Sequence, residues 1–108
     1  MTIMEHSETL LRIRSICLGR KGAYARFDRT SKKADIILLS TIIPVGRHSI
    51  PFADIETALV RKKERNDGNA DYGLTLRRRR GANLSFACRT RDEAMDLMRK
   101  IVDFLEIP

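Results

Sequence analysis

Residues 77–80 are four consecutive arginines, the densest group of chemically distinctive side chains in the sequence. A guanidinium group binds phosphate or carboxylate through two parallel hydrogen bonds, so such a run could form an anion site. Alternate residues of a strand point to opposite faces, which places Arg77 and Arg79 outside and Arg78 and Arg80 at an inner rim. A solvated hairpin tip is the simpler interpretation, because arginines at a strand end also oppose aggregation. The sequence leaves both interpretations open.

A second basic cluster, residues 61–65, ends a long predicted strand, and we interpret it as a solvated strand end. Nucleic-acid binding would combine such clusters with stacking aromatic side chains. The chain has only two tyrosines and four phenylalanines, and Phe27, Phe86 and Phe104 are expected in the core. This pattern therefore argues against nucleic acid as a partner.

Patterns typical of catalysis or of metal binding do not stand out. The two histidines, His6 and His48, and the two cysteines, Cys17 and Cys88, follow no zinc-ligand or CxxC spacing. We find no nucleophile–base arrangement and no glycine-rich phosphate loop before a helix. We therefore expect a non-enzymatic protein without a cofactor or a metal. Both cysteines are expected to be reduced in the core, and a disulfide between them is the alternative.

The net charge of +7 is unevenly distributed, because acidic residues outnumber basic ones in segment 90–106. Positive charge is concentrated in segment 10–89, which should attract an anionic membrane surface or an acidic protein. No secretory signal is visible, and the longest apolar run, residues 36–45, is shorter than the roughly 20 residues of a membrane span. We expect a cytoplasmic protein, peripheral at the membrane if its charge binds lipid. Residues 42–45 tuck under the fold, continue a strand, or form an exposed apolar tip.

The elements that position these residues are predicted to be mostly strands. Seven candidates, separated by turn signals, cover residues 10–18, 23–29, 33–39, 47–52, 55–65, 72–80 and 83–89. This spacing favours an antiparallel sandwich or barrel. We expect residues 1–9 to form a flexible tail and residues 10–108 a single domain.

The last hairpin and a terminal helix are the most clearly marked elements. A turn at Gly81 would place Leu76 opposite Phe86 and Leu74 opposite Cys88, on one buried face. Thr90 and Glu93 have the spacing of a capping box, which starts a helix. The apolar residues that follow share one helical face, and they are Ala94, Leu97, Met98, Ile101 and Leu105. The helix is therefore expected to cover the open end or face of the sheet structure.

This order of elements resembles the pleckstrin-homology-like domains of bacterial type. Residues 50–55 resemble the corner between the fourth and fifth strands of that family. The strand at 72–76, the basic glycine turn, residues 84–86 and the capped helix continue the pattern. The resemblance implies a mainly β (α+β) fold, a seven-stranded antiparallel barrel or sandwich with one C-terminal helix, acting as a binding module.

In lipid-binding members of that family, three loops gather at one end of the barrel. The corresponding residues here are 19–22, 41–47 and 79–82, and Lys21 and Arg26 match part of the family's headgroup motif. Asp28 stands where that motif ends in arginine, which argues against specific phosphoinositide recognition. The resemblance thus implies one basic rim, which consists of Arg20, Lys21, Arg26, Arg47, Arg79 and Arg80. The alternatives are a structural domain that forms homo-oligomers through a sheet edge and, third, nucleic-acid binding.

Overall fold

The computed structural model describes residues 2–16 and 20–107. Within these residues the chain forms eight strands, one short 3₁₀ helix and one α-helix. In chain order they are β1 (Thr2–His6), β2 (Leu10–Ser15), β3 (Lys21–Asp28), β4 (Lys33–Ser40), β5 (Ile43–Pro51), η1 (Phe52–Asp54), β6 (Ile55–Glu64), β7 (Ala70–Arg78), β8 (Leu84–Cys88) and α1 (Arg91–Phe104). The predicted mainly β fold with a C-terminal helix is confirmed.

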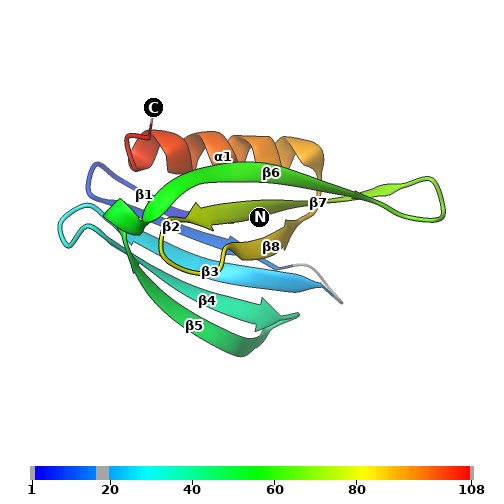
Figure 1. Ribbon diagram of the computed structural model, residues 1–108, viewed down its shortest axis with the longest axis horizontal. Coiled ribbons are helices and arrows are strands. Elements are labelled where there is room, and N and C mark those ends of the chain that lie inside the picture. The colour runs from blue at the N-terminus through cyan, green and yellow to red at the C-terminus, as the bar shows by residue number, and fades with distance from the viewer. Residues whose placement is uncertain (1, 17–19, 108) are drawn as a thin grey trace.

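The strands form two antiparallel sheets that do not close into a barrel. Sheet A follows the order β1-β2-β3-β4-β5 and sheet B the order β6-β7-β8, with η1 at the corner between them (Figure 1). The structure therefore has one strand more than the seven that we predicted. The additional strand, β1, lies in the segment expected to be a tail. A register shift between Ile3 and Glu5 breaks its alternation, which explains why the sequence shows no strand pattern there.

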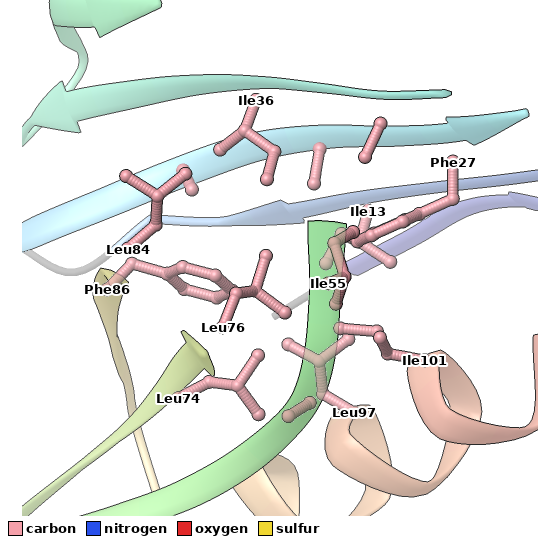
Figure 2. Packing of buried hydrophobic residues seen from close by; sticks show 14 of the residues in the cluster. Ile13, Phe27, Ile36, Ile55, Leu74, Leu76, Leu84, Phe86, Leu97 and Ile101 are labelled. Atoms are coloured by element: carbon pink, nitrogen blue, oxygen red, sulfur yellow. The ribbon is translucent and has the colours of Figure 1, made fainter. Parts of the chain in front are cut away.

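The hydrophobic core lies between the inner faces of the two sheets and α1. Sheet A contributes alternate residues of its inner strands, among them Leu11, Ile13, Phe27 and Ile36, all at most 1% exposed. Figure 2 shows Leu97 and Ile101 of α1 pointing toward the same cluster. The alternation of buried and exposed side chains is what lets each sheet bury one face. Cys88 is fully buried, as expected, whereas Cys17 lies outside the described residues.

The register of the β7–β8 hairpin differs from the predicted one. Leu74 pairs with Phe86 and Leu76 with Leu84, so each predicted partner on β8 is displaced by two residues. The displacement keeps the same face buried, because side-chain direction repeats every two residues. These pairs centre the turn on Arg80 rather than on Gly81, and within the turn the Arg78 backbone N–H donates to Asn83 Oδ1 at 3.0 Å.

The C-terminal helix begins and packs as the sequence indicates. Thr90 caps it, its Oγ1 accepting a hydrogen bond from the Glu93 backbone N–H at 3.1 Å. The Glu93 carboxylate accepts from the Arg89 backbone N–H at 3.2 Å, one residue before the predicted partner. The fully buried residues are Ala94, Leu97 and Ile101, with Phe104 only 2% exposed. This face covers the opening between the sheets and contacts all three strands of sheet B (Figure 1).

Candidate anion-binding site

The six residues of the predicted basic rim do not gather at one end of the molecule. Arg20 and Lys21 lie at the start of β3, beside the end of β4, because Lys21 pairs with Ser40. Arg79 lies at the corner between the sheets, where its backbone N–H donates to the Asp54 carbonyl at 2.8 Å. Figure 1 shows these two regions on opposite sides of the molecule. We call them the pocket end and the corner end.

The direction of β7 explains this separation. The Arg20 guanidinium donates to the carbonyl of Tyr72, near the start of β7, whereas Arg79 and Arg80 follow the end of that strand. A strand advances about 3.3 Å per residue, so the step from Tyr72 to Arg78, where β7 ends, covers roughly 20 Å. The expectation that Arg20 and Arg80 share one rim is therefore wrong.

Arg26 and Arg47 occupy a third region, the outer face of sheet A. Arg26 pairs with Asp35 on β4 and forms an ion pair with Asp28 at 3.6 Å. Arg47 is exposed on β5 and pairs with Ile37. Neither residue lines the hollows at the pocket end or at the corner end. The expected single rim is thus divided among three surfaces.

The pocket end instead holds a basic pocket of about 250 Å³ that combines both sheets. Sheet A contributes Lys21 together with the preceding Arg20, and sheet B contributes two cations of β6. The lining residues are Arg20, Lys21, Arg61, Lys63, Asp71 and Tyr72. We call the four cations with Asp71 and Tyr72 the basic pocket. Cations outnumber carboxylates there four to one, as in a site for phosphate or another anion.

Hydrogen bonds fix Arg20 in this pocket. Its Nη1 donates to the Cys88 carbonyl and its Nη2 to the Tyr72 carbonyl, both at 3.0 Å. Arg61 lies over Gly73, where an added Cβ would stand 2.9 Å from Arg61 Nη2. Glycine therefore leaves room for this guanidinium group. Arg20 is therefore held by backbone carbonyls, and Arg61 occupies the space above Gly73.

Asp71, the carboxylate that lines the basic pocket, has a cationic partner that lies outside the pocket. Asp71 forms an ion pair with Arg65 at 3.6 Å, and Asp67 shares the same guanidinium at 3.2 Å. Within residues 2–16 and 20–107, Lys21, Arg61 and Lys63 form no ion pair. The positive charge of the pocket is consequently available to a ligand.

An apolar tip stands beside the basic pocket. Ile42, Ile43 and Val45 in and after the β4–β5 turn are 67%, 66% and 57% exposed, and we name this group the apolar tip. The turn is tied to the pocket because the Thr41 backbone N–H donates to the Arg20 carbonyl at 3.3 Å. Residues 43–45 are the first residues of β5, so this segment continues a strand, and its apolar side chains are exposed rather than tucked under the fold.

The corner end carries a different arrangement, in which Asp54 holds the arginine run. Asp54 is 7% exposed, and its carboxylate accepts from Arg78 Nε at 2.9 Å and from the Arg80 backbone N–H at 2.7 Å. Burial alone would raise the pKa of Asp54, but these hydrogen bonds and the charge of Arg78 together lower the pKa below its usual value. Arg78 therefore has a structural partner, while Arg79 and Arg80 are exposed.

The sequence analysis missed the contribution of β6 to the site. Residues 61–65 were interpreted as a solvated strand end, yet Arg61 and Lys63 complete the basic pocket. Their spacing of two places both on one face, and that signal was present in the sequence. What the sequence did not show is that this face lies beside Arg20 and Lys21.

Comparison with known proteins gives no assignment, since neither any family model nor any curated protein matches the chain. In the part of the chain that the structure describes, no helix is long and apolar enough to cross a bilayer.

Proposed function

We propose that this protein is a non-enzymatic binding module that docks on an anionic membrane surface through its pocket end. The observation that carries the proposal is the coincidence of the basic pocket and the apolar tip at one end. Peripheral membrane proteins combine these two features, since cations attract anionic headgroups and apolar side chains enter the interface. Either feature alone would favour a membrane less strongly.

The magnitudes are consistent with reversible binding. Each basic residue near an anionic surface contributes about 1 kcal/mol, and the pocket provides four. Burial of the exposed parts of Ile42, Ile43 and Val45 adds about 25 cal/mol for each Å² of apolar surface removed from water. Together these contributions support attachment that depends on both salt and lipid composition.

We further propose that the fold is a variant of the pleckstrin-homology-like domain. Strands β2–β5 would correspond to its first four strands, β6–β8 to its last three, and α1 to its terminal helix. Strand β1 would be an addition at the edge of sheet A. The order of the strands within each sheet supports this assignment.

Sedimentation with lipid vesicles tests the membrane proposal. We expect the protein to pellet with vesicles that contain phosphatidylserine and to stay in solution with pure phosphatidylcholine vesicles. Lys21→Glu/Lys63→Glu should weaken binding to the anionic vesicles about tenfold or more, because two of the four positive charges of the basic pocket are reversed.

The arginines of the corner end provide a matched control. Arg79→Glu/Arg80→Glu changes the net charge by the same amount but alters exposed residues at the corner end. Its binding should stay within about twofold to threefold of the parent, since interactions beyond a Debye length of about 10 Å are screened. Equal pelleting with both kinds of vesicle, or equal loss in both double variants, would reject the proposal.

A further inference from the structure

The outer face of sheet A carries an apolar hollow that the membrane proposal does not use. It measures about 290 Å³, and Met4, Tyr24 and Ile37 form its apolar part. Arg12, Arg26 and Asp35 lie around these residues. Met4 is 43% exposed, and α1 contacts sheet B rather than this face. An apolar hollow framed by charged side chains is the usual form of a protein interaction surface.

Two rows of side chains cross this face at right angles to the strands, and their charges differ. In the first row, Glu5 pairs with Arg12 at 3.5 Å, and Arg26 lies between Asp28 and Asp35. The acids and bases of this row offset one another. It therefore offers little net charge to a partner.

The second row runs Arg14, Tyr24, Ile37, Arg47, as the strand registers of β2 to β5 show. Neither arginine of this row forms an ion pair with a residue of the described ranges. An aromatic and an aliphatic side chain thus lie between two uncompensated guanidinium groups. This pattern is complementary to a segment that carries one apolar side chain between two carboxylates.

The spacing defines that segment more closely. Arg14 and Arg47 are separated by three inter-strand steps of about 4.8 Å, or roughly 14 Å in total. Four residues of an extended chain cover about 13 Å, and their first, third and fifth side chains point to the same side. We propose that this face binds an extended acidic peptide segment of a partner protein, in which two acidic residues four positions apart flank a central apolar residue.

Fluorescence anisotropy with a labelled peptide tests this proposal. The probe is Ser-Glu-Ser-Phe-Ser-Glu-Ser, and its control has glutamine in place of both glutamates. We expect saturable binding of the glutamate peptide and at least about fivefold weaker binding of the glutamine peptide. Arg14→Glu/Arg47→Glu should weaken binding of the glutamate peptide by a similar factor or more.

The controls separate this face from general electrostatics and from loss of folding. Arg77→Glu/Arg79→Glu makes the same charge change at exposed positions elsewhere and should bind the peptide within about twofold of the parent. Arg14→Gln/Arg47→Gln is a milder variant, and a thermal melt of each variant checks that it is folded.

Four outcomes would overturn the proposal. They are no saturable binding of the glutamate peptide at millimolar concentration, equal affinity for both peptides, equal weakening by the control variant, or loss of vesicle pelleting in Arg14→Glu/Arg47→Glu with peptide binding intact. The last result would assign the face to the membrane.

Discussion

Asp54 accepts hydrogen bonds from three of the four consecutive arginines at residues 77–80, which the sequence alone presents as one uniform basic run. Its side chain accepts from Arg78 Nε and from the Arg80 backbone N–H, and its carbonyl accepts from the Arg79 backbone N–H. These bonds join the corner after β5 to the end of β7. The sequence predicted correctly that Arg77 is outside and Arg78 further inward, because alternation is local. It did not identify the partner carboxylate, which lies far away along the chain.

We expect Asp54→Asn to lower the melting temperature at neutral pH. We also expect the melting temperature of this variant to change less with pH under acidic conditions than that of the parent. The pKa of Asp54 is lower in the folded protein than in the unfolded chain, where it is about 3.9. A lowered folded pKa gives stability that is present above the unfolded pKa and is lost as the pH falls through the folded pKa. The difference between parent and variant in calorimetric melts should therefore shrink as the pH falls from about 5 through the lowered pKa of Asp54.

Asp103→Asn is the control for this series, because Asp103 is an exposed carboxylate on α1. Its melting temperature should follow that of the parent at every pH. A gap between parent and Asp54→Asn that stays constant down to the acid limit would contradict the assigned role of Asp54.

The elements differ in how well their sequences define them. The start of α1 was predicted correctly because the capping residues Thr90 and Glu93 act within one turn. Strand β5 begins at Ile43, earlier than the predicted Arg47, because Pro44 and Gly46 were interpreted as loop residues. Proline is tolerated there since β5 is an edge strand of sheet A. Local signals therefore predicted where α1 begins, whereas the start of β5 depends on its pairing with β4.

Ile101 tests the role of α1 as the cover of the core. It is fully buried in the hydrophobic cluster to which both sheets contribute, so Ile101→Ala should reduce the free energy of unfolding by about 2–5 kcal/mol. Ile101→Asp should abolish cooperative folding, because an unpaired carboxylate would be buried. Urea denaturation followed by circular dichroism measures both effects.

The neighbouring exposed residue of the same helix gives the reference. Arg99→Ala should change the free energy of unfolding by no more than about 0.5 kcal/mol. Similar losses in Ile101→Ala and Arg99→Ala would mean that α1 does not cover the core as described.

At the scale of the whole molecule, the sequence predicted the fold class but not which loops meet. Loop assignment by resemblance placed Arg20 and Arg80 together, and the path of β7 separates them. The basic pocket arises because β3 packs beside β8, which brings Arg20 and Lys21 to the same hollow as cations of β6, far away along the chain. Charge and periodicity indicate how many cations lie outside the core, but only tertiary packing decides which of them converge.

Vesicle binding through the basic pocket and through the apolar tip should depend differently on salt concentration. Ile42→Ser/Ile43→Ser should weaken binding to phosphatidylserine vesicles by a similar factor at low and high salt, because burial of apolar surface is not screened. The effect of Lys21→Glu/Lys63→Glu should disappear near 1 M salt, where the Debye length is about 3 Å. Vesicle sedimentation across a salt series measures both responses.

Met4→Ser serves as the comparison for the apolar tip, since Met4 is exposed on the outer face of sheet A. It should leave vesicle binding unchanged at all salt concentrations. If Ile42→Ser/Ile43→Ser behaves in the same way as Met4→Ser, the tip does not enter the interface.

Arg20 also determines how much a ligand must reorganise the protein. Its two bonds to the carbonyls of Tyr72 and Cys88 already fix this long side chain, which would otherwise lose rotamer entropy on binding. Capture of an anion should consequently proceed without backbone rearrangement and at a rate set by encounter. The same bonds join the start of β3 to strands β7 and β8. An anion bound in the pocket should therefore slow the separation of the two sheets, which amide hydrogen exchange would measure.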